Sequence, residues 1–295
     1  MSTMCPAAAA LIVLLPMSVA SAQSAFQSID SWIKEPGARV ETGGDSVIVR
    51  RGTVRTARLY SDFSLRFEFR ITEPNSEGRV FVRSRFGYGD RNEVGYRVEL
   101  TGRTGANALG RVSGAALELK IAEFNPPPIA APDHWQECEI RAERTRLSVR
   151  VNGLLVTEAQ ALDEFTGYVA LQVSRGGIEF RNVKAASQPS ASDTFGQGAY
   201  RASEPGIVKP RALKTAKPFY PWEPHDSWIQ GSVSLELVVD SSGSAGDIRV
   251  AKSLHPDLDE AAIGSARKWR FSPGTRSGQP VPVIVTMDVS FQRTQ

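Results

Sequence analysis

Apolar and polar residues alternate with a period of two along much of the first 185 residues. In residues 65–71, every second side chain is apolar and those between are charged. Asn152-Gly153, a typical two-residue hairpin turn, separates two further runs of this kind. Many short strands with polar turns, and no helix-period segment between them, predict an antiparallel two-sheet sandwich. The clearest alternating runs are residues 65–71, 96–100, 117–121 and 147–151.

The pattern changes near the C-terminus. Residues 232–240 alternate as a strand, and Ser241-Ser242-Gly243 turns the chain toward a second strand. Pro256 then predicts the start of a helix, because its missing N–H is not needed in the first turn. Acidic residues follow it and suit the positive end of a helix. With a last strand predicted from Val281 to Phe291, the order β-β-α-β indicates a small α+β domain.

The length of 295 residues fits two domains. Between them, residues 187–217 are rich in Ser, Ala, Gly and Pro and show no hydrophobic period, which is typical of a linker. The predicted organisation is a signal peptide over residues 1–22, a mainly β sandwich over residues 23–186, the linker, and the α+β domain over residues 218–295.

The first 22 residues have the features of an export signal. They carry no charged side chain, and an apolar run ends in Ala20-Ser21-Ala22, small residues at the spacing that a signal peptidase accepts. The run is shorter than the ~20 residues that a membrane-spanning helix needs. We therefore expect cleavage before Gln23 and a periplasmic or secreted protein. An uncleaved segment anchored in the inner membrane is the alternative, because no Lys or Arg precedes the apolar run.

Charge and motifs exclude several functions. The formal net charge is +3 with no block of like charge, so a nucleic-acid partner is not expected. The three histidines are far apart in sequence, and we predict no metal site. No glycine-rich phosphate loop and no serine nucleophile elbow occurs, and no cofactor is expected. Cys138 lies in an alternating run and is interpreted as a buried core thiol.

Several motifs occur in order within residues 205–293. They are Tyr220-Pro221, Gly231, Val239-Asp240, Gly243, the stretch from Ser253 to Pro273, Gly278 and Pro280-Val281-Pro282. In these residues the second domain resembles the C-terminal domain of the TonB family of periplasmic energy-transducing proteins. The resemblance implies a domain that pairs an edge strand with a short segment of an outer-membrane transporter. A chain cleaved from the inner membrane cannot transmit force from it, so the sequence favours partner binding over energy transduction.

A second set of motifs covers residues 26–185. It comprises Ser61 to Phe69, Phe81-Val82-Arg83, Gly95 to Glu99, His134-Trp135, Val151-Asn152-Gly153, Gly167-Tyr168 and Phe180 to Val183. Here the first domain resembles the 3-keto-disaccharide hydrolase family. The resemblance implies a concanavalin-like jelly roll with a sugar-facing sheet, in a family whose members act on glycosides with an oxidised ring carbon.

The candidate sugar-site residues come from this first domain. Arg83, Arg97 and Glu99 alternate with apolar neighbours and are predicted to share one face. Glu99 could act as a general acid or base, and the two arginines could hold hydroxyls or a keto oxygen. Trp135 could stack on a sugar ring. A solvated face with cross-strand ion pairs explains the same pattern.

Whether the first domain is an enzyme is left open. Members of the family that it resembles often carry Glu at the place of Arg97 and Gln at the place of Glu99, which weakens the case for catalysis. The predicted function is therefore an exported binding protein that contacts carbohydrate and docks on an envelope protein of the outer-membrane transporter class. The alternative is a periplasmic hydrolase or lyase of 3-keto-glycosides that uses the second domain for targeting.

The last strand is the predicted docking element, because an exposed sheet edge can accept a strand from another chain. Its candidate partner-binding residues are Val281, Val283, Val285, Met287 and Val289.

Overall fold

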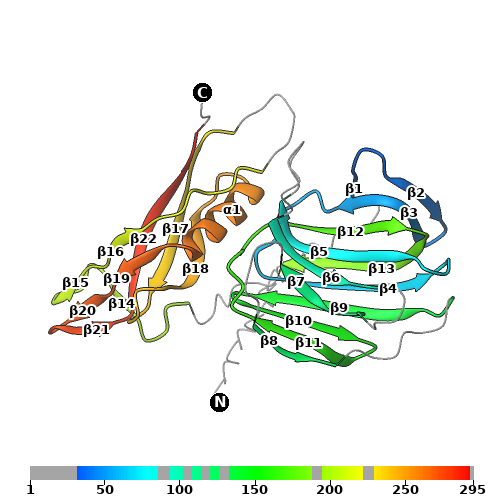
Figure 1. Cartoon of the computed structure of the whole chain (residues 1–295). Coiled ribbons are helices and arrows are strands. Elements are labelled where there is room, and N and C mark those ends of the chain that lie inside the picture. The colour runs from blue at the N-terminus through cyan, green and yellow to red at the C-terminus, as the bar shows by residue number, and fades with distance from the viewer. Residues whose placement is uncertain are drawn as a thin grey trace, which may run out of the picture.

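The computed structural model describes residues 32–85, 94–101, 108–114, 120–125, 133–187, 195–221 and 229–292. The chain forms a β-sandwich followed by a smaller domain whose helix lies on the side toward the sandwich (Figure 1). The predicted signal peptide, residues 1–22, lies outside the described residues. In the described ranges, no helix combines the length and apolar character needed to cross a membrane.

Two antiparallel sheets form the sandwich, and β3 (Ser46–Arg55) contributes one half to each. Sheet A contains, in spatial order, β2 (Arg39–Gly43), the first half of β3, β13 (Ile178–Ser187), β4 (Phe63–Ile71), β9 (Gln136–Glu143), β10 (Arg146–Val151), β11 (Leu154–Gln160) and β8 (Lys120–Phe124). Sheet B contains β1 (Ile33–Lys34), the second half of β3, β12 (Tyr168–Arg175), β5 (Glu77–Arg85), β6 (Val94–Glu99) and β7 (Val112–Gly114).

The inward side chains of both sheets form the core of the sandwich. Phe63, Phe67 and Phe69 on β4 are buried, and the rings of Phe67 and Phe180 lie 6.0 Å apart between centroids. Cys138 lies among them with no exposed surface, and burial raises the pKa of its thiol. The prediction of a buried core thiol is confirmed.

The predicted hairpin and helix start are confirmed. Asn152 and Gly153 have φ angles of 50° and 79° and join β10 to β11, as a two-residue turn with left-handed residues requires. Helix α1 (Pro256–Arg267) has Pro256 in its first turn. His255 caps it, because its Nδ1 accepts a hydrogen bond from the backbone N–H of Asp257.

The C-terminal domain is the predicted small α+β unit. Its main sheet has the order β14 (Tyr200–Arg201), β22 (Val283–Phe291), β17 (Gly231–Val239) and β18 (Ala245–Lys252). Leu258 and Ala262 of α1 pack with the inward residues of this sheet. Two smaller sheets join β15 (Ile207–Val208) to β20 (Gly274–Arg276) and β21 (Gln279–Val281), and β16 (Arg211–Lys214) to β19 (Arg270–Ser272).

The prediction of an unfolded linker over residues 187–217 is wrong for its second half. Strands β14, β15 and β16 all lie within it and pair with β22, β20 and β19 of the C-terminal domain. Each of these strands has only two to four residues. Strands this short produce no visible hydrophobic period, because the signal needs a longer alternating run.

The predicted last strand also begins later than expected. Val281 belongs to β21, where it pairs with Gly274, and β22 begins at Val283. Pro282 lies between them and has no N–H to donate to a ladder, which separates the two strands.

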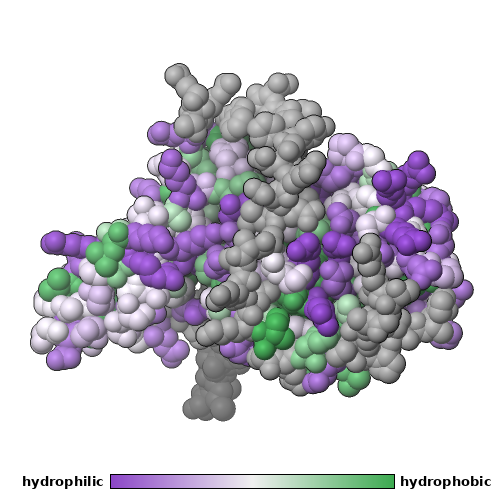
Figure 2. Space-filling view, viewed as in Figure 1, coloured by the Kyte–Doolittle hydropathy of each residue, from purple (hydrophilic) through white to green (hydrophobic). Residues whose placement is uncertain are grey.

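Large exposed apolar side chains in the described part of the chain are scattered over both domains. Figure 2 shows hydrophobic residues in small separate patches among hydrophilic ones on the face in view. On this face, the described residues therefore form no single apolar surface that would mark a partner site. The exposed residues are Ile121 and Leu154 on the sandwich and Val208 and Leu213 on the C-terminal domain.

Candidate functional site

The structure separates the predicted sugar-site residues into three places. Arg83 lies where the two domains meet, Arg97 and Glu99 lie on the outer face of sheet B, and Trp135 lies on the outer face of sheet A. The prediction that Arg83 shares a face with Arg97 and Glu99 is therefore wrong.

Arg83 is a structural residue with no exposed surface. Its guanidinium donates hydrogen bonds to the backbone carbonyls of Ser61, Arg144 and Glu164 at 2.7–2.9 Å. Its φ of 51° and the register shift between Val82 and Arg85 mark a bulge in β5. The bulge ends the alternation that predicted an outward side chain, so the prediction of Arg83 as a sugar ligand is wrong.

Arg97 and Glu99 do share a face, as their spacing predicts. Their neighbours Tyr96 and Val98 are in the core, so both side chains point away from it. Glu99 lies opposite Arg79 in the ladder, with 3.9 Å between the carboxylate and the guanidinium. Burial raises the pKa of Glu99, and the charges of Arg79 and Arg97 oppose that rise. A carboxyl with a raised pKa is suited to proton transfer.

Trp135 is on the opposite side of the sandwich from Glu99. It precedes β9, and its ring contacts two outward side chains of sheet A. The Cζ atom of Arg181 lies 4.0 Å from the ring centroid and that of Arg70 lies 4.8 Å from it. These cation–π contacts fix the ring on the outer face of sheet A.

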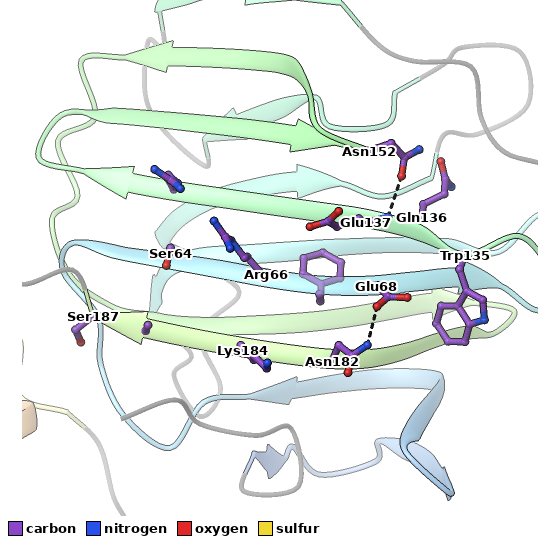
Figure 3. Close-up of a pocket in the computed structure, with 13 residues that line it drawn as sticks. Ser64, Arg66, Glu68, Trp135, Gln136, Glu137, Asn152, Asn182, Lys184 and Ser187 are labelled. Carbon is purple, nitrogen blue, oxygen red and sulfur yellow. Dashed lines mark hydrogen bonds between the residues drawn. The ribbon is translucent and has the colours of Figure 1, made fainter. Parts of the chain in front are cut away.

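A groove of about 900 Å³ runs over this outer face, across β13, β4 and β9. Figure 3 shows Trp135 at one end of it and Ser187 at the other, with polar side chains between them. Its lining residues are Ser64, Arg66, Phe67, Glu68, Trp135, Gln136, Glu137, Arg141, Asn152, Asn182, Lys184, Ala186 and Ser187.

The polar groups of the groove are partly engaged and partly free. Glu68 accepts hydrogen bonds from Arg181 and Asn182 at 2.6 Å each, and these bonds lower the pKa of its carboxyl. Glu137 and Lys184 have no side-chain partner among the described residues. An aromatic ring beside amides, a free carboxylate and a free ammonium is suited to binding a hydroxyl-rich ligand.

Sequence reasoning named Trp135 but missed the rest of the groove. The register of β13 shifts between Arg181 and Lys184, and Asn182, which lies within the shift, has a φ of 53°. The alternation in β4 and β9 identifies the outward residues Glu68 and Glu137, but it does not show that the two strands are neighbours.

The free side of β22 is a separate candidate site. On the side away from β17, β14 pairs with Val283 and Ile284, and no other described strand pairs with β22 there. The carbonyls of Pro282 and Ile284 accept hydrogen bonds from Tyr200 and Ala202 on this side. Because backbone groups alternate between the two sides of a strand, the free groups belong to Thr286, Asp288 and Ser290.

The predicted partner-binding residues of β22 are not the residues whose backbone groups are free. Val283 and Val289 are buried, and Val285 and Met287 are half-buried against the domain core. A partner strand would therefore contact the backbone of β22 at the residues between them, which sequence reasoning did not name.

Together these features define a two-domain β-rich protein: a sandwich with a polar groove joined to an α+β domain with an open sheet edge. The family model for the 3-keto-alpha-glucoside-1,2-lyase-like domain matches residues 22–186, which is more than half of the chain. The chain belongs to this family. The model for the C-terminal domain of the Gram-negative bacterial TonB protein matches residues 216–292, so the second domain is a TonB C-terminal domain.

Two curated relatives are TonB proteins. The protein TonB of Xanthomonas campestris is 39% identical over 75 residues, which is 25% of this chain and 34% of the relative. That of Vibrio cholerae is 30% identical over 108 residues, which is 36% of this chain and 43% of the relative. The chain thus spans less than half the length of these relatives.

Similar solved structures match the sandwich. A putative glycosyl hydrolase from Parabacteroides distasonis is 16% identical, with 54% of this chain and 89% of that chain covered and a TM-score of 0.41. The carbohydrate binding module CBM66 from Bacillus subtilis is 18% identical, with 53% and 96% covered and a TM-score of 0.41.

Proposed function

We propose that this protein is an envelope adaptor that docks on a partner through β22 and contacts carbohydrate through the groove on sheet A. The proposed partner is an envelope protein of the outer-membrane transporter class, and the proposed location is the periplasm after removal of residues 1–22. The observation that carries the docking function is the unpaired side of β22 in a TonB C-terminal domain.

The geometry of β22 supports strand addition. The strand runs for nine residues, and only its first two pair with β14 on the free side. An extended peptide laid beside Thr286, Asp288 and Ser290 would find alternating donors and acceptors. The two TonB relatives support the choice of partner class.

Thr286→Pro tests the docking. Proline removes the free N–H at this residue, while the N–H groups that pair with β17 belong to the residues on either side. We expect capture of transporters from the native outer membrane to be lost by at least about tenfold, the equivalent of roughly 1.4 kcal/mol.

Thr286→Ala is the matched control, because it removes the side chain but keeps the N–H. It should capture the partner as well as the native protein does. Equal capture by Thr286→Pro, in a protein with an unchanged circular dichroism spectrum, would rule out docking at this edge.

The carbohydrate function rests on the groove. It combines the Trp135 ring with the amides of Asn152 and Asn182 and with the side chains of Glu137 and Lys184, which have no side-chain partner in the described part of the chain. Sugar-binding sites need such a mixture, since a pyranose presents apolar C–H faces and a rim of hydroxyls.

A second candidate function is favoured by Glu99. Its raised pKa suits a general acid in a hydrolase or lyase of 3-keto-glycosides that would work on the outer face of sheet B. Turnover of a 3-keto-disaccharide by residues 23–295, lost in Glu99→Gln, would establish this activity. No turnover across a panel of keto-sugars would leave the adaptor function.

A further inference from the structure

We infer that the sandwich and the C-terminal domain work as one rigid body, held together at helix α1. A partner on β22 would then hold the sandwich in a fixed position instead of on a flexible tether. This last consequence rests on the proposed docking function, whereas the rigid junction itself does not.

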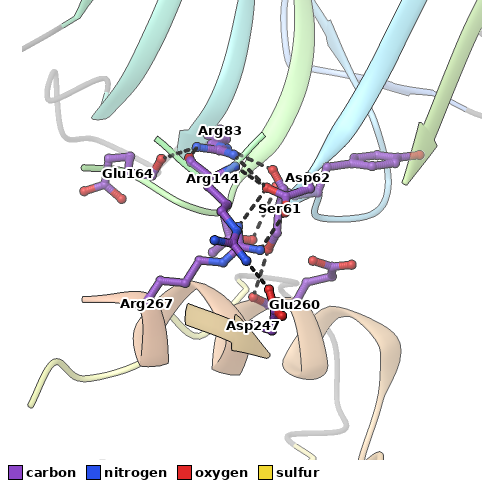
Figure 4. A network of polar contacts seen from close by, with 10 residues as sticks. Ser61, Asp62, Arg83, Arg144, Glu164, Asp247, Glu260 and Arg267 are labelled. Atoms are coloured by element: carbon purple, nitrogen blue, oxygen red, sulfur yellow. Dashed lines mark hydrogen bonds and ion pairs between the residues drawn. The ribbon is translucent and has the colours of Figure 1, made fainter. Parts of the chain in front are cut away.

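The centre of the junction is a carboxylate shared by three arginines. Both oxygens of Asp62 accept hydrogen bonds from Arg267 of α1, at 2.8 and 2.6 Å. Asp62 also accepts from the Arg83 guanidinium at 3.2 Å and from the backbone N–H of Arg144 at 2.8 Å. Figure 4 shows Asp62 of the sandwich between Arg83 and Arg267. A two-oxygen pair of this kind fixes orientation as well as distance.

Close apolar packing surrounds this polar centre. Leu59 and Tyr168 of the sandwich are buried in the core cluster of the C-terminal domain. Gly264 of α1 faces Thr166, and a Cβ atom at Gly264 would lie 2.4 Å from Thr166 Cγ2. The helix therefore approaches the sandwich more closely than any other residue type would permit.

Two further ion pairs tie the domains together at other points. Lys268, just after α1, contacts Glu164 at 2.9 Å, and Arg144 pairs with Asp247 of β18. With Asp62–Arg267, these pairs attach the sandwich to α1, to the residue just after it and to β18.

Residues 200–214, which lie between the two domains in sequence, do not act as a spacer between them. Strands β14, β15 and β16 are paired into the C-terminal domain, as described above. The docking edge nevertheless stays open. The β18 end of the main sheet contacts the sandwich through Asp247, and β22 lies on the other side of β17 (Figure 1).

The distance between two spin labels tests the rigid junction. Labels at Arg150→Cys on the sandwich and Gln279→Cys on the C-terminal domain occupy exposed sites, and the native Cys138 is buried. In residues 23–295 we expect one narrow distance distribution. A broad or multiple distribution in this otherwise native protein would overturn the inference.

Gly264→Leu places a wedge between α1 and Thr166 without entering the core of either domain. We expect the distance distribution to widen at least twofold while the far-ultraviolet spectrum is unchanged. Lys252→Leu, at an exposed position of β18, is the matched control and should leave the distribution narrow. A narrow, unshifted distribution in Gly264→Leu would show that α1 does not hold the domains together.

Arg267→Gln provides a second variant in case the wedge prevents folding. It removes the bidentate pair but leaves Asp62 bonded to Arg83, and we expect it to widen the distribution as well. Thr286→Pro should keep the narrow distribution whether or not docking occurs. A failure of the docking function is thereby distinguished from a failure of the rigid junction.

Discussion

Two groups of arginine–carboxylate pairs in this protein have similar geometry but very different exposure. At the junction, the side chains of Asp62, Arg267 and Arg83 are 15%, 8% and 0% exposed. On the outer face of sheet A, Glu139 pairs with Arg66 and Arg141. The Glu139 carboxylate is 14% exposed, much as Asp62 is, but the two arginine side chains are 57% and 44% exposed.

Exposure decides what each group of charges can do. An exposed ion pair in water contributes about 0.2–1 kcal/mol, since solvent screens it. Removing one member of a buried pair costs about 3–5 kcal/mol, because the other charge is left without compensation. The junction charges therefore stabilise the arrangement of the domains, whereas the charges around the groove can exchange water for ligand hydroxyls at small cost.

The largest predicted effect is that of Asp62→Ala. It leaves the buried Arg83 guanidinium and Arg267 without their carboxylate. We expect the free energy of unfolding, measured with urea, to fall by about 3 kcal/mol or more. Arg83 keeps its three backbone carbonyl acceptors in this variant. We therefore expect the loss to lie at the lower end of the range of about 3–5 kcal/mol.

Glu139→Ala is the matched control, taken from the ion pairs on the outer face of sheet A. It also removes a carboxylate with two arginine partners, yet we expect a loss below about 1 kcal/mol. Similar losses in the two variants would show that exposure does not separate the two groups.

The next largest predicted effect is that acid weakens the junction between the two domains. Burial acts to raise the pKa of Asp62, but the hydrogen bond and charge of Arg267, with further help from Arg144 and Arg83, bring it below its ordinary value. A carboxylate with a lowered folded-state pKa contributes stability above its unfolded pKa of about 3.9, and the contribution is lost as pH falls through the folded value.

The spin-label distances should therefore be constant from about pH 5 to 8 and broaden below about pH 4. In Asp62→Asn this acid dependence should be weaker than in the native protein. Distances that stay narrow in the native protein down to about pH 2 would exclude Asp62 as the titrating group.

Trp135→Ala should have a smaller effect, confined to the groove. Loss of one aromatic contact of about 0.5–1.5 kcal/mol predicts up to roughly tenfold weaker binding. Calorimetry with a panel of neutral disaccharides, a 3-keto-disaccharide among them, measures this. Glu99→Gln, on the opposite face, should bind as the native protein does. The reverse pattern would move the carbohydrate site to sheet B.

Periodicity and turn chemistry predicted the fold well because both are local. The alternation in residues 65–71, the Asn152-Gly153 turn and the Pro256 helix start each depend on a few consecutive residues. The candidate site instead depended on which strands are neighbours and on which sheet each strand belongs to, and these are long-range properties of the fold. Alternation shows that Glu99 points outward from its strand, but it does not show that Trp135, just before β9, lies on the other sheet.

Arg83 and β22 illustrate two further limits of prediction from the sequence. One left-handed residue in β5 reverses the side on which Arg83 lies, and the bulge at residues 82–85 contains no glycine that would mark it in the sequence. In β22, the apolar residues are conspicuous in sequence because they fill the core, whereas the free backbone groups belong to the polar residues between them.

The smallest predicted effect is that of Glu260→Gln at the junction. Glu260 lies on α1, and its backbone carbonyl accepts a hydrogen bond from Ser61 of the sandwich. Burial raises the pKa of its carboxyl. Such a group contributes stability below its unfolded pKa of about 4.3, and the contribution is lost as pH rises through the folded value.

The glutamine variant carries no charge to bury. Its free energy of unfolding in urea should therefore exceed that of the native protein near pH 7, by about 1 kcal/mol or less, and the two should converge below about pH 4. A glutamine variant that is less stable than the native protein near pH 7 would contradict this prediction. Glu260 would then act as an ionised partner of Arg58 and Arg267, whose charges favour its anionic form. The junction would in that case be held by two carboxylates, and Asp62→Ala would remove only part of its electrostatic stabilisation.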